Sequence, residues 1–400
     1  MANTLKLGAG KWATGTDTVL AFNDENNNFK PLPFSFSRAS SATVVNQSGL
    51  IETVGSGTPR IDFKDNTKGA LLLEPTRSNA LLQSNQFDTT WVIGASALNL
   101  TSGQSGIYGS NNAWLLKKNT SGARFLQQTL SLSSAKYTYS VYLKAESTNF
   151  ALIWTYNGST DAETYFDLAN GVIGDSTGNN LNNAKIESVG NGWYRCTLTY
   201  TQSTTLVRIY PAYSNENVST GTDSGIYIQH AQLEVGSYPT SIIPTSGSAV
   251  TRVKDVCNQT PPSGVIGQTE GVIYVESNNL LPSGTRSIAV AYTSGSSFYQ
   301  IYLTSTNQIR VDISGSLLIL SNSININILN KIAFAYKSGE NALYVNGVLM
   351  GSSVSTTVPS SLNDFYLGNL LGNEQSGSYQ DLKLYNTRLS NAELQALTTI

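Results

Sequence analysis

At 400 residues and 42.9 kDa, the chain exceeds the usual size of one compact domain, so two or three domains are expected. Charged residues make up 12% of it, and 24 Lys and Arg against 26 Asp and Glu leave a net charge of −2. Nucleic acids and anionic lipid surfaces are bound by clustered basic side chains, so this composition argues against both as partners. The sequence has no apolar run of about 18 residues, which excludes membrane insertion by a helix, and its start lacks the layout of a signal peptide.

The first 85 residues carry few long alternating runs of polar and apolar side chains, and Pro31, Pro33, Pro59 and Pro75 punctuate them. We expect residues 1–85 to lie against another surface instead of building a large core of their own. They are interpreted as an attachment region.

Residues 86–247 alternate polar and apolar side chains with a period of two, as in 137–144 and 204–210. This alternation is typical of half-buried strands. Asn-Gly pairs suit the positive φ of tight turns and predict hairpins. They occur at 157–158, 170–171, 191–192 and 346–347.

A linker is expected at 248–262, and evenly spaced strands occupy 263–400. Near the end, Ser390 and Glu393 have the spacing of a capping box ahead of Leu394, which predicts one short helix. Strands at this spacing without intervening helices indicate sandwiches. The predicted fold class is all-β: two tandem β-sandwich (jelly-roll) domains preceded by the irregular N-terminal region, with one short C-terminal helix.

Three sets of short motifs carry resemblances to known families. The first set resembles the N-terminal signature of bacteriophage virion and tail proteins: FSRASSAT at 36–43, GLIETV at 49–54, PRIDF at 59–63 and LLLEPTRSN at 71–79. The second is similar to the carbohydrate-binding-module jelly rolls that follow this signature: YSVYLKA at 139–145, GWYR at 192–195, AQLE at 231–234 and TRVKD at 251–255. The third resembles the laminin-G or concanavalin-A-like lectin sandwich: IAFAY at 332–336, ALYVNG at 342–347, FYLG at 365–368 and LKLYNTRLS at 382–390.

These resemblances imply a setting and an assembly. They imply a virion protein, made in the cytoplasm of the host bacterium, that contacts other virion proteins through residues 1–85. By analogy with phage fibres, we expect a homotrimer. A shared fold serves many functions, so the resemblances imply architecture more firmly than any ligand.

Enzymatic chemistry finds little support in the residues. Histidine is the most common general base near neutral pH, and the single His230 lies in an alternating strand pattern that favours a structural role. Glycoside hydrolysis needs only two carboxylates, and Asp161, Glu163 and Asp167 lie close in sequence, but we expect them to be solvated loop acids. Neither HExxH nor CxxC occurs. We therefore predict a protein that is not an enzyme and has no catalytic residues.

No cofactor is expected, although calcium stays open because loop carboxylates are ligands it prefers. Asp223, Asp312 and Asp364 are the candidates, and each is expected to be an ordinary turn or strand residue, so the metal site is left unassigned. Cys196 and Cys257 are expected to be free thiols, because the chain is made in a reducing compartment.

Sugar binding fits the residues best. Aromatic faces pack on the C–H patches of a pyranose, while amide, hydroxyl and guanidinium groups bond its hydroxyls. Side chains alternate between the two faces of a strand, which places Arg208 and Tyr210 on one face and Tyr142 on the face opposite Val141. Trp154 and Tyr156 share a face, and whether that face is the core side is left open. The predicted glycan-binding residues are Tyr142, Trp154, Tyr156, Arg208 and Tyr210. The alternative is that these rings are core or a subunit interface.

Three functions follow in order. The first is a non-enzymatic head or tail fibre or appendage that adheres to cell-surface polysaccharide or environmental glycans. The second is a capsid decoration protein without a ligand. The third is a polysaccharide depolymerase, although no catalytic pair stands out and the short repeats of a parallel β-helix are absent.

Overall fold

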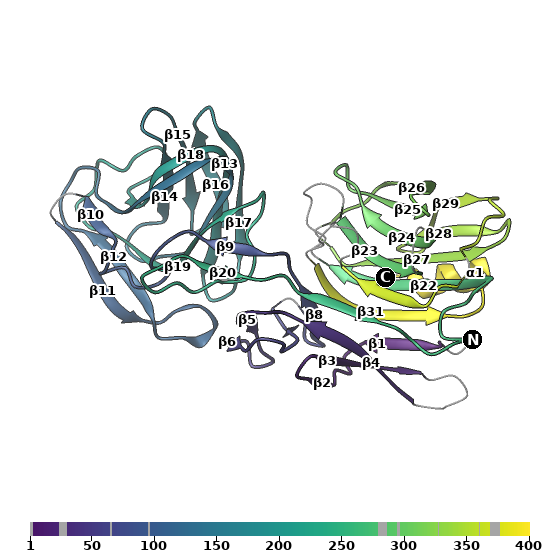
Figure 1. Ribbon diagram of the computed structural model, residues 1–400. Helices are drawn as coiled ribbons and strands as arrows, with labels where there is room; N and C mark the ends of the chain where they lie inside the picture. Colours follow the sequence, from purple (N-terminus) through teal and green to yellow (C-terminus); the bar gives the residue numbers. More distant parts are fainter. Residues whose placement is uncertain are drawn as a thin grey trace. The chain divides into compact units, whose positions relative to one another are not determined.

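A computed structural model describes residues 3–23, 30–64, 66–94, 97–278, 286–293, 297–326, 328–359, 361–368 and 377–400. Within these residues the chain is almost entirely β-strand, with one α-helix at the C-terminal end. The predicted all-β class is confirmed. The chain divides into two compact units: unit 1 comprises Met1–Thr76 and Val253–Ile400, and unit 2 comprises Arg77–Arg252 (Figure 1).

This division differs from the boundaries expected at residues 85, 247 and 262. Residues 3–76 do not form a separate irregular region, because their strands complete the sheets of the C-terminal sandwich. In particular, β1 (Leu5–Gly8) pairs with β31 (Gly377–Tyr385), and β4 (Lys30–Ser37) pairs with β21 (Val256–Gln259). Unit 2 is thus an insertion in the sequence of unit 1.

Unit 1 is a sandwich whose two layers enclose an apolar core that includes Phe34, Tyr299 and Phe334. One layer follows the order β31, β22, β27, β28 and β29, and the other β4, β21, β30, β23, β24, β25 and β26. The remaining bounds are β22 Glu270–Asn278, β23 Arg286–Tyr292, β24 Phe298–Leu303, β25 Gln308–Ile313, β26 Ser316–Ser323, β27 Asn330–Lys337, β28 Asn341–Val345, β29 Val348–Ser353 and β30 Asp364–Leu367. The strands β1, β3 (Thr18–Asn23) and β4 connect the two layers. Smaller pairings in unit 1 involve β2 Thr14–Gly15, β5 Ala42–Val45, β6 Ile51–Val54, β7 Ile61–Asp62 and β8 Ala70–Leu73.

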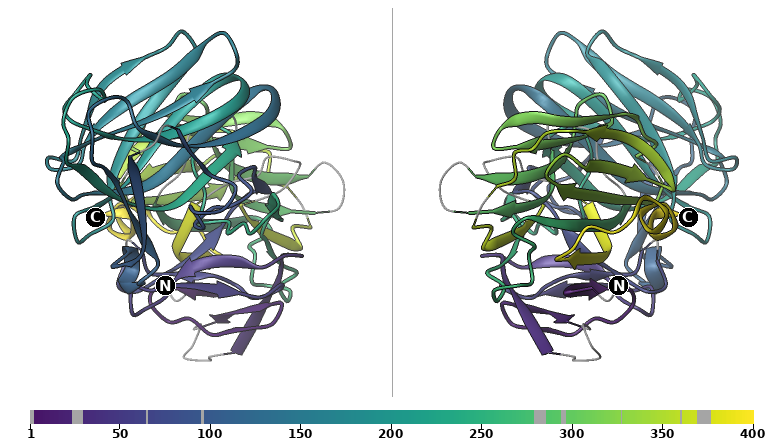
Figure 2. Two further views of the ribbon diagram at one scale, coloured as in Figure 1. Left: turned by 90° about the vertical axis from the view of Figure 1, so that its left-hand side faces the viewer. Right: turned by 90° about the vertical axis from the view of Figure 1, so that its right-hand side faces the viewer.

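The predicted C-terminal helix is α1 (Asn391–Thr398). Ser390 accepts the Glu393 backbone N–H, and the Glu393 carboxylate accepts the Ser390 N–H, so the capping box is formed. Its buried Leu394 packs with Tyr274, Ala333 and Tyr344 on the outer side of the β22 layer, where Figure 2 shows the yellow helix.

A buried charge network joins the two chain segments of unit 1. Arg38 Nη1 donates to Asp255 Oδ1 at 3.1 Å, Arg60 Nη1 donates to Glu74 Oε2 at 2.7 Å, and Arg60 Nη2 donates to Asp255 Oδ2. Two further hydrogen bonds join Glu74 and Asp255: the Glu74 N–H donates to Asp255 Oδ2, and the Asp255 N–H donates to the Glu74 carbonyl. All four residues come from the motifs at 36–43, 59–63, 71–79 and 251–255. Because buried charges are costly without partners, this set has to assemble together.

Unit 2 is also a two-layered sandwich, and its two longest strands serve both layers. The N-terminal part of β13 (Phe125–Ala145) pairs with the C-terminal part of β18 (Trp193–Ala212), and the reverse holds in the other layer. Bulges between Thr129 and Ala135 mark the change of layer. Figure 2 shows these blue-green strands curving side by side.

The other strands of unit 2 complete the two layers. The first layer has β10 (Val92–Gly94), β14 (Phe150–Tyr156), β15 (Asp161–Asp167) and β16 (Val172–Thr177) beside the long strands, and the second has β11 (Leu98–Gln104), β12 (Ala113–Lys118), β17 (Leu181–Ser188) and β19 (Ser224–Val235). The Asn-Gly pairs at 157–158, 170–171 and 191–192 connect paired strands as predicted, and so does the pair at 346–347 in unit 1. Asn191 and Asn346 have φ of 53° and 51°, and the glycines that follow them also have a positive φ, as this tight turn requires.

The ends of unit 2 lie together. β9 (Arg77–Asn79) pairs with β20 (Val250–Arg252), which sets Arg77 opposite Arg252. Cys196, in unit 2, and Cys257, in unit 1, are both free and buried, as predicted. A search of the described residues finds no helix of the length and apolar character that crossing a bilayer requires.

Candidate functional site

The outward face of the first layer of unit 2 gathers aromatic and charged side chains. Alternate residues of β14 and β18 point into the core, with Ala151, Ile153, Val207 and Ile209 fully buried. The residues between them therefore point outward. We call this surface the Trp154 face and define it by Phe125, Gln127, Trp154, Tyr156, Asp161, Glu163, Arg208 and Tyr210.

A stack of rings and one guanidinium group forms the centre of the Trp154 face. The Trp154 and Tyr156 rings stack with centroids 5.3 Å apart and planes at 11°. The Arg208 Cζ lies 4.5 Å from the Trp154 ring centroid and 3.8 Å from that of Phe125. Arg208 is therefore held between two aromatic side chains, and each such cation–π contact contributes about 0.5–2 kcal/mol.

Two hydrogen bonds fix the orientation of this guanidinium. Arg208 Nε donates to Gln127 Oε1 at 2.9 Å, and its Nη1 donates to the Tyr210 hydroxyl at 3.1 Å. The Tyr210 ring in turn packs on Phe125 with centroids 5.1 Å apart. Arg208 thus keeps a set geometry while its Nη2 has no hydrogen-bond partner among the described residues.

Gly94 makes room for this arrangement. It lies opposite Phe125 across β10 and β13, and a Cβ built there would come 1.8 Å from Phe125 Cε2. The Phe125 ring therefore lies over the bare backbone of Gly94. Any side chain at this position would push the ring away from Arg208.

Two carboxylates flank the stack. Asp161 Oδ2 accepts the Trp154 indole N–H at 3.1 Å, and Glu163 Oε1 accepts the Thr177 hydroxyl at 2.9 Å. Glu163 lies directly opposite Trp154 on the neighbouring strand. Burial raises the pKa of Glu163, and the nearby charge of Asp161 raises it further, while the Thr177 bond lowers it. The third acid considered from sequence, Asp167, instead caps the turn at Ala169 and Asn170.

The structure places four of the five predicted glycan residues on this face. Trp154, Tyr156, Arg208 and Tyr210 lie together, although Tyr210 is only 7% exposed and acts mainly as support. Tyr142 does not join them. It lies beyond the bulges of β13, where its neighbours across the sheet are Arg195 and Gln229.

Tyr142 belongs to a buried cluster in the second layer. Tyr142 is 3% exposed, and the Arg195 Cζ lies 5.3 Å from the centroid of its ring. The rings of Tyr142 and His230 meet edge to face, with their centroids 6.4 Å apart. His230 adopts a φ of 45° at a bulge of β19, and burial together with Arg195 lowers its pKa to about 4. A neutral, structural imidazole results, which agrees with the role expected for it.

Sequence reasoning missed Phe125, Gln127 and Gly94, and assigned Asp161 and Glu163 to a solvated loop. Two signals were available in the sequence. Residues 125–129 belong to a predicted strand, and Asp161 and Glu163 are two residues apart, which places both side chains on the same face of a strand. The register that brings these residues beside Trp154 depends on long-range strand pairing, which the sequence does not display.

The three carboxylates considered for calcium contact protein donors. Asp223 pairs with Lys117 at 2.9 Å, Asp312 accepts Arg310 Nε at 2.6 Å and the Tyr302 hydroxyl at 2.9 Å, and Asp364 accepts the Thr260 hydroxyl at 2.5 Å. Across the described ranges, no group of three His, Cys, Asp or Glu side chains is placed to share an ion.

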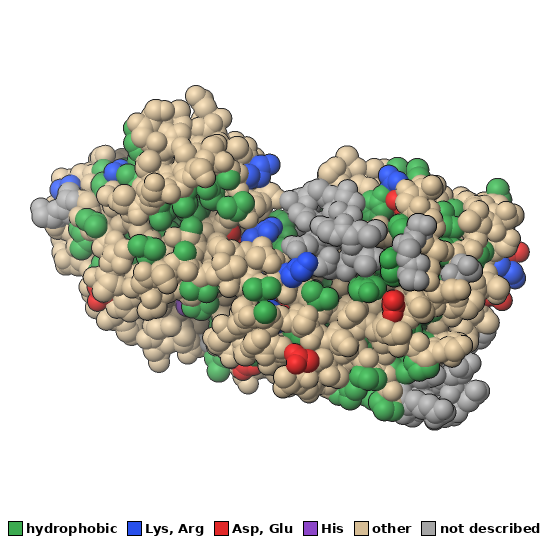
Figure 3. All heavy atoms as spheres, in the orientation of Figure 1, with side chains coloured by type: hydrophobic (Ala, Val, Ile, Leu, Met, Phe, Trp, Pro, Cys, Tyr) green, Lys and Arg blue, Asp and Glu red, His purple; other side chains and the backbone are tan. Residues whose placement is uncertain are grey.

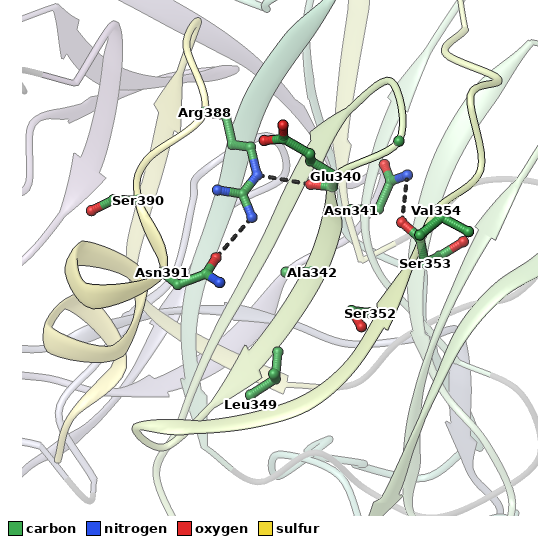
Figure 4. A pocket seen from close by; sticks show the side chains of 11 residues that line it. Glu340, Asn341, Ala342, Leu349, Ser352, Ser353, Val354, Arg388, Ser390 and Asn391 are labelled. Carbon is green, nitrogen blue, oxygen red and sulfur yellow. Dashed lines mark hydrogen bonds between the residues drawn. The ribbon is translucent and has the colours of Figure 1, made fainter.

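Unit 1 has a shallow hollow of about 520 Å³ between the β28–β29 hairpin and the start of α1 (Figure 4). Arg388 lines it, but its guanidinium donates to the Glu340 and Leu389 carbonyls and to Asn391 Oδ1. Asn341 Nδ2 likewise donates to backbone carbonyls. With its main polar groups engaged inside the chain, this hollow is a weaker candidate than the Trp154 face.

The side of the molecule drawn in Figure 3 carries few Lys, Arg, Asp and Glu side chains among its polar and apolar atoms. This agrees with the 12% of charged residues in the chain. A surface of this kind offers hydrogen-bonding groups without a strong field of either sign.

Comparison with known proteins supports the lectin-type fold of the C-terminal part. Residues 274–395, which lie in unit 1, match the model of the family described as the concanavalin A-like lectin/glucanases superfamily, so this part of the chain is similar to that family. No curated protein matches the chain.

Among the solved structures that are similar to part of this chain are the following three. The CBM40 of a Ruminococcus gnavus IT-sialidase bound to α2,3 sialyllactose is 16% identical, with a TM-score of 0.30, and the match covers 33% of this chain and 84% of that one. Domain 4 of AbnA, a GH43 extracellular arabinanase from Geobacillus stearothermophilus in complex with arabinotriose, is 15% identical, with a TM-score of 0.31 and coverage of 36% and 73%. A heptameric SAP-like pentraxin from Limulus polyphemus is 13% identical, with a TM-score of 0.28 and coverage of 33% and 70%. At TM-scores of this size, none of the three bears on the site of this chain.

Proposed function

We propose that this protein is a non-enzymatic, glycan-binding component of a bacteriophage particle, and that the Trp154 face of unit 2 binds the glycan. The observation that carries the proposal is the outward-facing Trp154–Tyr156 stack beside a fixed Arg208. Half-buried rings of this kind offer apolar surface to the C–H groups of a sugar.

Polar groups around the stack complete the chemistry. Arg208 has unused N–H groups, and Asp161 and Glu163 each have unused acceptor sites, since a carboxylate can accept up to about four hydrogen bonds. Sugar hydroxyls both donate and accept, so one ring could engage all three side chains.

The phage setting rests on the motifs at 36–43, 49–54, 59–63 and 71–79, which resemble a virion signature. Contact with other virion proteins through residues 1–85 and assembly as a homotrimer remain part of the proposal. Because residues 3–76 contribute strands to unit 1, attachment would involve the surface of that unit. Repeated weak sites on a particle gain about 10²–10⁴ in apparent affinity from multivalency.

A depolymerase is the second candidate, and one observation favours it. Asp161 and Glu163 share the face with the ring stack, and the raised pKa of Glu163 is the direction a general acid needs. A capsid decoration protein without ligand is the remaining alternative. A glycan array and a reducing-end assay together separate the three functions.

The test is a glycan array probed with the full chain and with Trp154→Ala and Tyr156→Ala. Tyr213→Ala is the matched control, because it removes a ring of unit 2 that is 56% exposed outside the Trp154 face. Binding that both face variants lose and the control keeps supports the proposal. A flat array with folded protein supports decoration, and release of reducing ends from a bound polysaccharide supports the depolymerase.

A further inference from the structure

The charges on the Trp154 face restrict the kind of glycan it can hold. Arg208 is the cation of the defined face, whereas Asp161 and Glu163 lie on the strand beside Trp154. Asp175 on β16 adds a third carboxylate in this layer, and the pKa of the Tyr165 phenol, raised chiefly by burial, is raised further by the charges of Glu163 and Asp175. Carboxylates therefore outnumber the guanidinium around the ring stack.

These opposite charges do not cancel by pairing. The contacts of Arg208 are Gln127, Tyr210 and two aromatic rings, and within the described residues no carboxylate lies within 4.0 Å of its guanidinium. Asp161 bonds the Trp154 indole and Glu163 bonds Thr177, each with a single side-chain donor. The face thus presents separate donor and acceptor groups, each with unused capacity.

A neutral sugar satisfies both kinds of group. Its hydroxyls donate to Asp161 and Glu163 and accept from Arg208, and hydrogen bonds to charged groups are about twice as strong as neutral ones. A sugar that carries a carboxylate or sulfate can pair with Arg208, but Arg208 and Glu163 are both register partners of Trp154, on the strands at either side of it. Their backbones are thus about 10 Å apart, and the carboxylate of Glu163 is already costly to ionise because it is buried. A second negative charge on this part of the face opposes binding.

We propose that the Trp154 face selects uncharged glycans, such as hexose and N-acetylhexosamine chains, over sialylated or uronic-acid-containing ones, and that Asp161 and Glu163 set this selectivity. The inference rests on the proposed glycan-binding function and deepens it. Arg208 contributes hydrogen bonds to the neutral ligand, and the two acids both bind hydroxyls and exclude anionic sugars.

The experiment measures Kd values for neutral oligosaccharides and for the same cores with a sialic or uronic acid added. The proteins are the full chain, Asp161→Asn, Glu163→Gln and the double variant, because these amides keep an oxygen to accept the Trp154 and Thr177 bonds. Asp223→Asn is the control, since it removes one negative charge from a side chain of unit 2 that is 71% exposed and pairs with Lys117, outside the face.

We expect the unmodified chain to prefer the neutral form by about tenfold or more, which corresponds to about 1.4 kcal/mol of binding free energy. The double variant should narrow this ratio by about tenfold, and the control should leave it unchanged. High salt should also narrow it, because charges at a surface are screened. Equal or stronger binding of the acidic form, or a ratio unaffected by the double variant, would overturn the inference while leaving the glycan site intact. If the folded, unmodified chain binds neither the neutral nor the acidic oligosaccharides, the proposed glycan-binding function itself is contradicted.

Discussion

Trp154 is held by neighbours on the sheet before any ligand arrives. Tyr156 stacks on it, Arg208 lies over it, and Asp161 accepts its indole N–H. An orientation fixed in this way reduces the entropy that a ligand would otherwise have to remove. Gly94 supports the stack from its other end through Phe125.

Gly94→Ala tests this support. The added methyl would lie 1.8 Å from Phe125 Cε2, so the ring must move and Arg208 loses one of its two aromatic contacts. We expect unit 2 to lose about 1–3 kcal/mol of unfolding free energy, as in other overpacked sites. Gly15→Ala is the control, since nothing lies within 4 Å of the position its methyl group would take, and denaturant titration should show a change below about 0.5 kcal/mol.

His230 predicts a pH dependence for unit 2. Its pKa is about 4 in the fold and about 6.5 when unfolded, because burial and Arg195 disfavour the imidazolium. As pH falls from 6.5 to 4, the unfolded chain binds a proton that the folded chain does not bind, so stability falls in this window. Because the residue as a whole is half-buried, we expect a loss of about 1–2 kcal/mol. Denaturant titrations at several pH values should show this slope, and His230→Asn, whose side chain tolerates a positive φ, should remove it.

Asp62 predicts the opposite slope for unit 1. Burial raises the pKa of its carboxyl to about 6, although the Val45 N–H it accepts acts in the other direction. Between pH 6 and about 4 the folded chain holds a proton that the unfolded chain has released, so stability rises as pH falls. Asp62→Asn, which keeps an acceptor for Val45, should flatten the dependence and stabilise unit 1 at pH 7. An unchanged pH profile in this variant would contradict the assignment.

At the scale of elements, the hairpins and the strand parities follow from the sequence. Asn191-Gly192 and Asn346-Gly347 adopt the positive φ that their residue types favour. The placement of Tyr142 does not follow, because bulges between Thr129 and Ala135 move the second half of β13 into the other layer. A local pattern of alternation contains no sign of such a change of layer.

The N-terminal strands could not be placed from sequence for a related reason. β1 is only four residues long, and its partner β31 lies near the other end of the chain. Short strands with distant partners are specified by the cores they complete. The buried network of Arg38, Arg60 and Asp255 likewise joins segments of unit 1 that lie far apart in the sequence.

Asp255→Asn tests the importance of this network. It leaves Arg38 and Arg60 buried with less countercharge, and breaking a buried pair in this way typically costs about 3–5 kcal/mol. Asp223→Asn, which breaks an exposed pair, should cost less than about 1 kcal/mol. Thermal unfolding of the two variants provides the comparison, and equal losses would show that the buried charges do not hold unit 1 together.

For the whole molecule, the insertion of unit 2 into unit 1 predicts that each can fold alone. The two ends of unit 2 are close because the backbones of Arg77 and Arg252 pair between β9 and β20. The two segments of unit 1 are also close where unit 2 is inserted, since Lys254 N donates to Thr76 Oγ1 at 3.1 Å. Residues 77–252 expressed alone, and residues 1–76 joined to 253–400 by a short Gly-Ser linker, should each unfold cooperatively. A molten product from either piece would show that the units depend on each other.

The most direct test of the glycan site follows the tryptophan indole N–H signals by NMR while a neutral oligosaccharide that scores on the array is added to the full chain. Trp154 is half-buried on the proposed face, whereas Trp193 is 1% exposed, so each reports on a different environment. The signal of Trp154 should shift in a saturable manner while that of Trp193 stays in place. Saturable binding of the sugar with no change at Trp154 would contradict the site.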